Sequence, residues 1–443
     1  MSFPKYDRYK DSGVEWLGEV PEHWDVKRLR FIAMLNPSKS EVSKFDRETV
    51  ISFLPMEAIG IDGTINLEHE KAISEVETGY TFFREGDVTI AKITPCFENG
   101  KGAVMKGLLN GIGFGTTELI VARPETDQTF SEYLHWIFTS APFRNLGESY
   151  MYGAGGQKRV PDDFVQNFSL GLPPLPEQRS IATFLDRETT KIDELIAEQR
   201  QLIDLLKEKR QAVISHAVTK GLNPDAPMKD SAIEWLGEVP EHWNVGVLAR
   251  IAVRVVVGIA EAATHAYSDE GIPILRSTNI RSGRIIGDVL RINPDFSEGR
   301  GSKLLQAGDL VTVRTGNAGI TAIIPQDLDG CQCFTMLITT LNSDASSEFY
   351  CYFINSPLAQ SYFSIEGWGT AQINISVPIL KALPISIPPL PQQQSIAAFL
   401  DRETAKFDEL IAEAHHAIAL LRERRTALIS AAVTGKIDVR SLV

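Results

Sequence analysis

The stretch that decides the fold is Pro173–Ala197, with the sequence PPLPEQRSIATFLDRETTKIDELIA. It returns 215 residues later as Pro388–Ala412, with the sequence PPLPQQQSIAAFLDRETAKFDELIA. In each copy a stiff proline run leads into a long charged segment that is free of glycine and proline, which favours a helix. The chain therefore contains two tandem copies of one plan, and each copy ends in a long helix.

The apolar residues of this helix recur at intervals that average about 3.5 residues, the spacing of a coiled-coil seam. A seam of about 36 residues at roughly 1.5 Å per residue predicts a rod of about 50 Å. The alternative is two separate amphipathic helices, each packed on its own domain, but the matched seams favour pairing of the copies with each other. The seam positions are Ile181, Leu185, Ile192, Leu195, Leu202, Leu206 and Val213, then Ile396, Leu400, Phe407, Leu410, Leu421 and Leu428.

Polar residues interrupt the seam at matching places, with Glu188 and Glu403 near the start and Lys209 and Arg424 near the end. In an antiparallel pairing the glutamate of one helix would lie near the basic residue of the other. Such polar positions can fix register and direction at some cost in stability.

Composition places the chain among globular proteins of two or three domains, because 443 residues can build several cores and a hydrophobic content of 43% is ordinary. There is no apolar run of transmembrane length, and Met1–Asp7 has no hydrophobic signal core, so we expect a cytoplasmic protein. The cysteines are too few for a disulfide framework, and we expect Cys331 and Cys333 to be buried thiols, not metal ligands.

The net charge of −13 argues only weakly against a nucleic-acid partner, because binding uses one face and not the whole surface. The segment from Arg276 to Arg314 has a modest local excess of basic over acidic residues. Its basic residues are Arg276, Arg281, Arg284, Arg291, Arg300, Lys303 and Arg314.

A second repeat precedes each domain. Lys10–Trp24, KDSGVEWLGEVPEHW, recurs as Lys229–Trp243, KDSAIEWLGEVPEHW. Its two tryptophans favour a core or docking anchor, and we call this segment the clip. We expect the clip at 1–24, a first recognition domain at 25–171, a central helix at 172–220, a linker with the second clip at 221–243, a second domain at 244–386 and a C-terminal helix at 387–436.

The two domains share a framework and differ elsewhere, and both have a mixed α/β pattern. Strand-like runs at Thr89–Ile93 and Leu119–Ala122 come with turn signals at 60–63 and 110–113, and an aromatic helix follows at Glu132–Phe138. The second copy answers with a strand at 308–314 and an aromatic helix at Glu348–Ile354. Divergent loops on one framework suit two domains that recognise different targets, although drift after duplication would look the same.

A glycine-rich loop precedes each proline run, at Gly153–Val160 and at Gly367–Ile375, and it contains Gln157 and Gln372 at equivalent positions. Glycine lets a backbone approach a phosphate closely, and a glutamine amide can pair with adenine through two hydrogen bonds. A plain structural turn is the alternative. The predicted DNA contacts are Lys92, Gln157, Lys158 and Arg159 in the first domain, and Arg276, Arg281, Arg314 and Gln372 in the second.

Catalytic motifs are missing from the sequence. There is no Walker A pattern, so motor activity on nucleotide has no support. The run Gly111–Gly115 resembles a cofactor loop only superficially and is expected to be a turn. Asn293–Phe296 lacks the second proline of an adenine-methylation motif, and Pro294-Asp295 is not followed by the lysine that a nuclease site requires. We expect no catalytic residue, no bound cofactor and no metal in this chain.

The repeated helix start at Pro173–Ile196 and Pro388–Ile411, together with Trp16–Trp24 and Trp235–Trp243, resembles the specificity subunits of type I restriction–modification systems. The resemblance covers nearly the whole chain. It implies an α+β fold in which two tandem α/β target recognition domains are each followed by a long helix, and the two helices pair as an antiparallel coiled coil. Gln392 stands where the first copy has Glu177, which looks like a cosmetic departure.

The resemblance also implies a function. Each recognition domain would recognise one half of a bipartite site in double-stranded DNA, with half-sites about one turn apart. The coiled coil would set their spacing and dock two methyltransferase subunits. Methylation, translocation and cleavage would belong to those subunits and to restriction subunits, which would use S-adenosylmethionine, ATP and Mg²⁺. The alternatives are a self-contained methyltransferase or nuclease and a coiled-coil scaffold without a DNA role.

Overall fold

The computed structural model describes residues 3–154, 156–259, 266–297, 303–369 and 372–442. The chain forms two compact units. Unit 1 contains residues 1–199 and 416–443, and unit 2 contains residues 200–415. Both units therefore hold part of each long helix, and the domain limits expected from the sequence stay predictions.

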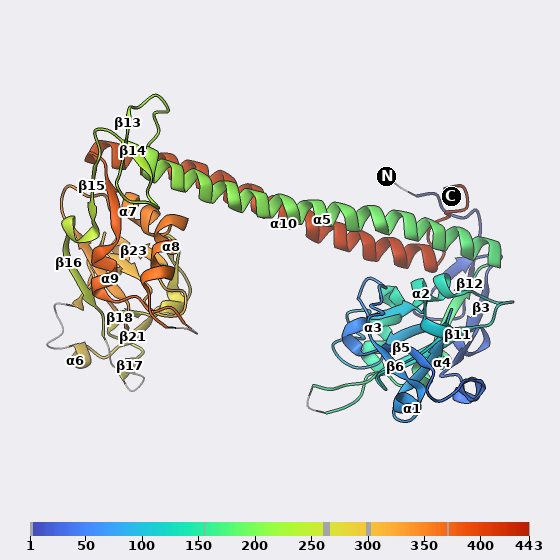
Figure 1. The fold of residues 1–443 in the computed structure, drawn as a ribbon. Helices are drawn as coiled ribbons and strands as arrows, with labels where there is room; N and C mark the ends of the chain where they lie inside the picture. Colours follow the sequence, from blue (N-terminus) through green and yellow to red (C-terminus); the bar gives the residue numbers. More distant parts are fainter. Residues whose placement is uncertain (1–2, 155, 260–265, 298–302, 370–371, 443) are drawn as a thin grey trace. The chain divides into compact units, whose positions relative to one another are not determined.

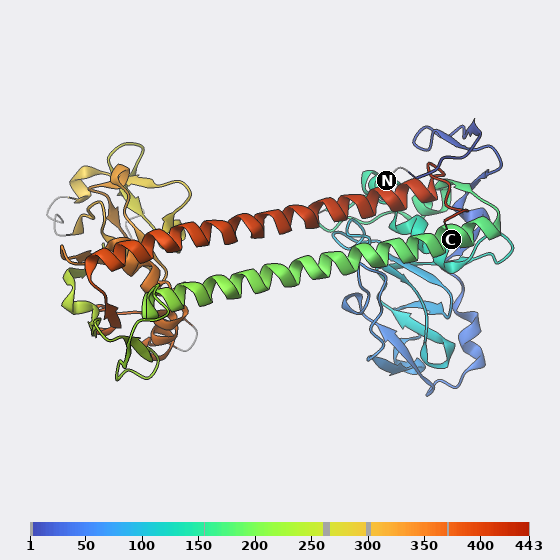
Figure 2. The same cartoon turned by 90° about the horizontal axis from the view of Figure 1, so that it is seen from above.

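The two long helices dominate the chain and are labelled α5 (Leu175–Lys220) and α10 (Leu390–Val433). They have 46 and 44 residues and lie within the predicted segments 172–220 and 387–436, each beginning inside its proline run. Proline at the first turn of a helix loses no intrahelical hydrogen bond, which is why Pro176 and Pro391 are tolerated there. Figure 2 shows α5 in green and α10 in red side by side.

Unit 1 is a mixed α/β domain built on two four-stranded sheets. One sheet has the order β6-β5-β10-β7 and the other β4-β11-β8-β9, and β10 pairs with β5 in parallel while the other pairs are antiparallel. The strands are β4 (Ala33–Leu35), β5 (Val50–Leu54), β6 (Glu70–Ala72), β7 (Thr81–Arg84), β8 (Val88–Ala91), β9 (Gly102–Val104), β10 (Ile112–Gly115) and β11 (Leu119–Pro124). The helices are α1 (Ile73–Val76), α2 (Ser131–Thr139), α3 (Ala141–Tyr150) and α4 (Asp162–Asn167).

Two short ribbons join this domain to the helices. The clip forms the hairpin β1 (Tyr9–Asp11) and β2 (Glu19–Pro21), and β3 (Asp25–Arg28) pairs with β12 (Ser169–Leu172), the strand that leads into α5. The predicted turn at 110–113 is partly wrong, because Ile112–Gly115 is the buried strand β10. Its glycines lie so close to Phe83 and to strand β5 that a side chain there would collide, so they serve sheet packing and not a cofactor loop.

Unit 2 repeats the plan. The sheet β16-β25-β22-β23 is antiparallel, and the sheet β17-β21-β18-β24 contains one parallel pair, β18 with β24. The strands are β13 (Met228–Asp230), β14 (Glu238–Pro240), β15 (Asn244–Val247), β16 (Ala252–Val257), β17 (Tyr267–Ser268), β18 (Ile272–Leu275), β19 (Ile280–Arg281), β20 (Arg284–Ile285), β21 (Leu290–Ile292), β22 (Leu310–Thr312), β23 (Thr321–Ile323), β24 (Gln332–Cys333), β25 (Leu337–Leu341) and β26 (Pro384–Ile387). The helices are α6 (Pro294–Ser297), α7 (Ser347–Ile354), α8 (Pro357–Glu366) and α9 (Val377–Ala382).

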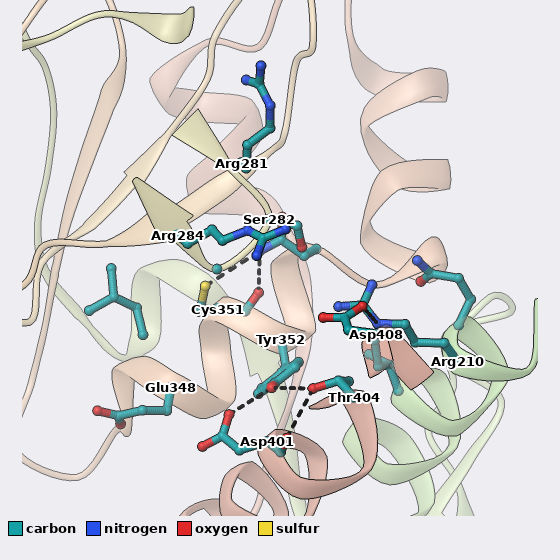
Figure 3. Close-up of a pocket in the computed structure, with 15 residues that line it drawn as sticks. Arg210, Arg281, Ser282, Arg284, Glu348, Cys351, Tyr352, Asp401, Thr404 and Asp408 are labelled. Atoms are coloured by element: carbon teal, nitrogen blue, oxygen red, sulfur yellow. Dashed lines mark hydrogen bonds and ion pairs between the residues drawn. The ribbon is translucent and has the colours of Figure 1, made fainter. Parts of the chain in front are cut away.

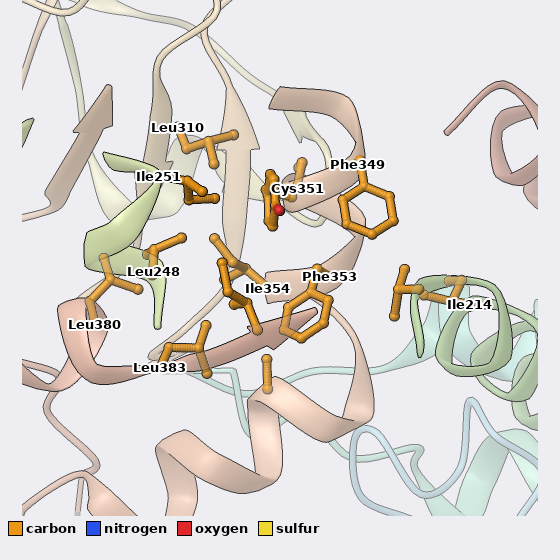
Figure 4. Close-up of a cluster of buried hydrophobic side chains, with 14 of the residues drawn as sticks. Ile214, Leu248, Ile251, Leu310, Phe349, Cys351, Phe353, Ile354, Leu380 and Leu383 are labelled. Carbon is orange, nitrogen blue, oxygen red and sulfur yellow. The ribbon is translucent and has the colours of Figure 1, made fainter. Parts of the chain in front are cut away.

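The core of unit 2 joins its domain to the helices. Ile214 near the end of α5 belongs to the same buried cluster as Phe349 and Phe353 of α7 and Trp243 of the clip (Figure 4). The aromatic helices predicted at 132–138 and 348–354 are α2 and α7, and each presents its aromatic face to such a core. The second tryptophan of each clip is confirmed as a core anchor, because Trp24 and Trp243 are fully buried. The first, Trp16 or Trp235, is half-buried against Phe168 or Tyr362.

The first residues of each long helix lock onto the clip. Trp24 Nε1 donates to Glu177 Oε1 at 2.9 Å, and Tyr6 donates its hydroxyl to the same oxygen at 2.6 Å. In unit 2, Trp243 Nε1 donates to Gln392 Oε1 at 2.7 Å. The change from Glu177 to Gln392 therefore preserves the acceptor, but it also removes a buried carboxylate that holds an additional tyrosine in unit 1.

Within each unit α5 and α10 run antiparallel, as predicted, but the seam differs in detail from the expected one. Leu195, Leu202 and Leu410 are exposed by 42 to 46%. In α5 the seam places of Leu195 and Leu202 are taken by the adjacent buried residues Ile196 and Ile203. In α10 the buried residues are Ala414 and Ile418, one and two turns beyond Leu410. The helix offers two apolar residues side by side at these places, and the seam uses the one that faces the partner.

The expected polar pairs across the seam are also wrong by about one turn. Glu188 binds Arg187 and Lys191 of its own helix, and Lys209 and Arg424 are exposed. The ion pairs between the helices are instead made by residues next in sequence or one turn away, Arg425 with Asp193 in unit 1 and Arg210 with Asp408 in unit 2. Among the described residues, no helix combines the length and apolarity needed to cross a membrane.

Candidate nucleic-acid interface

In unit 1 the glycine-rich loop folds back on the end of strand β8. Arg159 pairs with Tyr152 through two backbone hydrogen bonds of 2.9 and 3.2 Å, and it also bridges to Ile93. Val160 N donates to the carbonyl of Lys92 at 2.8 Å. The fold therefore brings Lys92, Lys158 and Arg159 together, although 66 residues separate Lys92 from Lys158.

Arg159 is held by a carboxylate that sequence reasoning missed. Its Nη2 and Nε donate to the two oxygens of Glu118 at 2.7 and 2.9 Å. The hydrogen bonds from Arg159 lower the pKa of Glu118, and the charge of Lys92 acts in the same direction. The pair fixes the guanidinium at the surface, where its side chain is 41% exposed.

The tip of the loop presents Gln157 and Lys158 to solvent. Lys158 is tied down through its backbone, since its N donates to Thr94 Oγ1 at 3.0 Å and its carbonyl accepts from Thr94 N at 2.9 Å. Gly153 has a φ of +144°, and a Cβ there would lie 2.4 Å from the carbonyl oxygen of Gln157. The glycine is therefore required for a tight hairpin that leaves the side chains of Gln157 and Lys158 free to contact a ligand.

Unit 2 builds the same hairpin with different residues. Asn374 pairs with Trp368 through backbone bonds of 3.0 and 3.3 Å, it bridges to Thr315, and Ile375 N donates to the carbonyl of Arg314 at 2.9 Å. Arg314 thus takes the place of Lys92, and Asn374 the place of Arg159. Here the cation comes from the strand end, because Arg314 Nε donates to Asn374 Oδ1 at 3.0 Å.

Arg281 and the loop that carries Gln372 border one hollow of unit 2. This hollow has a volume of about 470 Å³ and is lined by Arg281, Gly316, Asn317 and Ile373, among others. Gln372 is exposed beside Ile373. The structure therefore groups three of the four predicted residues of this domain, Arg281, Arg314 and Gln372, around the hairpin.

Arg276 lies apart from that group. Its Nη2 donates to the carbonyl of Asp288 at 3.4 Å, and its Nε is buried. The position is set by the 3-10 turn Ser277–Asn279, whose Asn279 also bonds Asp288. Arg276 therefore supports the turn that carries Arg281. Of the other basic residues counted in this segment, Arg300 lies outside the described residues.

A second cavity lies where the unit 2 domain meets the helices (Figure 3). It has a volume of about 420 Å³, and Tyr352 donates its hydroxyl to Asp401 at 2.7 Å on its floor. Arg281 extends away from Tyr352 and Asp401, toward the surface (Figure 3). In unit 1 the equivalent contact is Trp136 Nε1 to Asp186 Oδ1 at 2.9 Å. This cavity is part of the packing interface between the unit 2 domain and the helices α5 and α10.

The remaining chemistry of the chain is structural. Cys331 and Cys333 are buried, and burial raises the pKa of the Cys331 thiol to about 12. No group of three or more potential metal ligands occurs among the described residues. The histidines of the clips, His23 and His242, bind the starts of the helices, at Glu177 and Gln392.

Sequence reasoning also missed the exposed aromatic residues beside the hairpins. Tyr152 is 67% exposed and Trp368 is 59% exposed. The signal was present, since Tyr152 directly precedes Gly153 and Trp368 stands between Gly367 and Gly369.

The chain is thus a tandem protein in which two related α/β domains carry equivalent hairpins, each beside a basic residue, on a pair of long helices. The family profile described as type I restriction modification DNA specificity domain matches residues 262–418. The EcoAI specificity subunit of Escherichia coli is 47% identical over 189 residues, which is 42% of this chain and 31% of that protein. The EcoEI specificity subunit is 28% identical over 86% of this chain and 78% of that protein.

Solved structures share the fold. A chain from a structure of type I R-M complex assembly and conformational transition aligns with a TM-score of 0.76 and 18% identity, covering 94% of this chain and 98% of that one. The HsdS subunit from Thermoanaerobacter tengcongensis aligns over the same shares with a TM-score of 0.58 and 18% identity. Residues 262–418 of the chain match the type I specificity-domain family, and the chain is similar to specificity subunits of type I restriction enzymes.

Proposed function

We propose that this chain supplies DNA sequence specificity to a type I restriction–modification complex, and that each unit recognises one half of a bipartite site. The observation that carries the proposal is the repeated hairpin. The same backbone device presents Lys92, Gln157, Lys158 and Arg159 in unit 1 and Arg314, Gln372 and Asn374 in unit 2. A constant frame with different polar side chains is what recognition of two different half-sites requires, because base contacts give specificity while basic residues hold phosphates.

The paired helices are proposed to set the spacing between half-sites. Both helices are continuous over their full lengths of 46 and 44 residues. In each unit one ion pair links them, Arg425 with Asp193 in unit 1 and Arg210 with Asp408 in unit 2. Because a helix resists stretching, bases between the half-sites would be spanned without contact. A change in helix length would then change the spacer.

The same helices are proposed to dock two methyltransferase subunits. Their outer face carries leucines at equivalent positions of the two copies, Leu195 with Leu410 and Leu205 with Leu420, each 43 to 54% exposed. Each unit therefore offers one such leucine from α5 and one from α10. Exposed large apolar residues at repeated positions suit two identical partners.

Catalysis is proposed to reside in those partners, with S-adenosylmethionine, ATP and Mg²⁺ bound there and not in this chain. The competing function, a self-contained methyltransferase or nuclease, would require cofactor binding by the isolated chain. Titration of the purified chain with S-adenosylmethionine in a calorimeter separates the two. Binding in the micromolar range by the chain alone would contradict the proposal.

The main test is a map of modified bases in the host genome with and without this gene. We expect a two-part adenine-methylation motif that disappears on deletion and returns on complementation. Complementation with Gln157→Ala or Gln372→Ala then assigns each hairpin to a half-site. A lost bidentate contact costs about 1 to 3 kcal/mol at one base, so each variant should relax recognition in one half only. Equal relaxation of both halves by one variant would contradict the division between the units.

A further inference from the structure

Tyr152 and Trp368 occupy equivalent places in the two units. Each is the first residue of its hairpin, and each pairs through two backbone hydrogen bonds with the residue that ends it, Arg159 or Asn374. Despite their size they are 67% and 59% exposed. Tyr133 and Tyr350, on the helices α2 and α7 of the same units, are fully buried.

The backbone of each hairpin sets the position of the residue that carries the ring. Gly153 and Gly369 follow them with positive φ values of +144° and +115°. A Cβ at either glycine would lie within 2.4 Å of a carbonyl oxygen of the hairpin, that of Gln157 or Gln372. Both positions therefore require glycine for the hairpin to close, and the closed hairpin places the aromatic residue opposite Arg159 or Asn374.

A cationic group is anchored next to each ring. In unit 1 the cation is Arg159, which lies opposite Tyr152 and is paired with Glu118. In unit 2 the cation is Arg314, which donates to Asn374, the residue opposite Trp368. An aromatic face that stands beside basic side chains is the combination with which proteins stack on nucleic-acid bases, because the cation holds the phosphate while the ring contacts the base. Aromatic rings also fill the space that opens when a base leaves the helical stack.

We infer that Tyr152 and Trp368 are base-stacking residues, and that each ring inserts beside the base displaced for methylation in the half-site bound by its own unit. The inference rests on the proposed function, since a methyltransferase must take its target base out of the duplex. The ring would stabilise the vacated stack, so each residue would contribute to the affinity for the opened site. The difference between tyrosine and tryptophan would adapt the two units to different neighbouring bases.

The test uses the complex assembled from this chain and its methyltransferase subunits, with duplexes that carry the mapped site. Tyr152→Ala should weaken binding of the intact duplex about 5- to 100-fold, the range of one base stacked on an aromatic ring. The loss should shrink on a duplex with a mismatch at the methylated base of the matching half-site, because that base is already loosened. Trp368→Ala should respond only to a mismatch in the other half-site.

Conservative and matched variants separate stacking from folding. Tyr152→Phe and Trp368→Phe should retain most of the affinity, since the ring is kept. Phe31→Ala removes an aromatic residue of unit 1 that is 63% exposed but lies outside the hairpin, and it should leave binding unchanged. Equal losses on intact and mismatched duplexes, or no loss at all in a complex that methylates its two-part motif, would overturn the inference. Failure of the wild-type complex to methylate any two-part motif would instead contradict the proposed function.

Discussion

Arg425 of α10 donates from Nε to Asp193 of α5 at 3.1 Å, and this pair has a counterpart in unit 2 between Arg210 and Asp408 at 3.7 Å. Each member lies 215 positions from its counterpart. Because Asp193 and Arg210 lie 17 residues apart on one helix, the two copies can make this pair twice only if they run antiparallel. The ion pairs therefore record both the duplication and the direction of pairing.

The pair in unit 1 should behave as a direct electrostatic contact. Replacing Asp193 by Arg puts two cations opposite each other and should destabilise the chain by up to about 1 kcal/mol, because both groups are partly exposed. The double variant Asp193→Arg with Arg425→Asp should restore most of that loss. Urea unfolding of the wild type, the two single variants Asp193→Arg and Arg425→Asp, and the double variant gives the coupling energy. Additive effects would show that the two side chains do not interact.

Glu177 should matter for its acceptor oxygen more than for its charge. Glu177→Gln copies Gln392 of the second unit and keeps an acceptor for Trp24 Nε1. Glu177→Ala leaves the donors of Trp24 and Tyr6 without a partner in a buried place, at about 1 to 3 kcal/mol for each donor. Thermal unfolding should rank wild type and Glu177→Gln well above Glu177→Ala. Equal stability of the two variants would show that these hydrogen bonds contribute nothing.

The repeats made much of this fold predictable. Motifs such as FLDRET and WLGEVPEHW occur in both copies, and each has the same local structure at the equivalent place of the two units. The choice between Leu195 and Ile196 was not predictable, since adjacent apolar residues satisfy a spacing of 3.5 equally well. It depends on the rotation of the helix, which is set by packing at α2 and α7.

The candidate site was predictable by residue type but not by arrangement. Lys92 is a basic residue in a strand-like run and Arg159 is one in a glycine-rich loop, and the fold does bring them together. Glu118 could not be foreseen as the partner of Arg159, because β11 and the glycine-rich loop are far apart in the chain. Arg276 was chosen for its charge alone, and its contact with the carbonyl of Asp288 was not predicted. Its role as a DNA contact stays a prediction.

His135 should make the stability of unit 1 depend on pH. Its burial, with a smaller effect of Arg425 and Lys106, lowers its pKa from 6.5 to about 4, and Glu132 acts in the opposite direction. Between pH 6.5 and 4 the imidazole of His135 is protonated in the unfolded chain but not in the folded chain. The free energy of unfolding is therefore unaffected by His135 above pH 6.5 and decreases as the pH falls toward 4. The loss is at most about 3 kcal/mol.

The matched control for this effect is His135→Cys, because Cys351 occupies the equivalent place of α7. The variant should flatten the dependence of unfolding free energy on pH between 6.5 and 4 relative to wild type. Urea unfolding at a series of pH values measures the difference, which cancels the titration of the other groups. Parallel curves for the two proteins would show that His135 does not carry the effect.

Arg159 should contribute to phosphate binding in addition to its pairing with Glu118. If it contacts one phosphate, Arg159→Ala lowers the slope of log affinity against log salt concentration by about 0.9. Glu118→Gln removes the competing carboxylate charge and should strengthen binding at low salt. An unchanged slope in Arg159→Ala, with only a loss of stability, would reduce Arg159 to a structural partner of Glu118.

A heptad inserted into the long helices tests the proposed ruler. An insertion into α5 alone, between Gln199 and Arg200, leaves α10 nine residues shorter than its partner and moves Arg210 away from Asp408 or Asp193 away from Arg425. We expect impaired assembly and loss of methylation. The same insertion in both helices, with the second between His415 and His416, preserves both ion pairs and the seam, because seven residues equal two turns of a coiled coil. Genome methylation should then show both half-sites unchanged in sequence but separated by a longer spacer. An unchanged spacer in the double insertion would mean that the helices do not determine the distance between the half-sites.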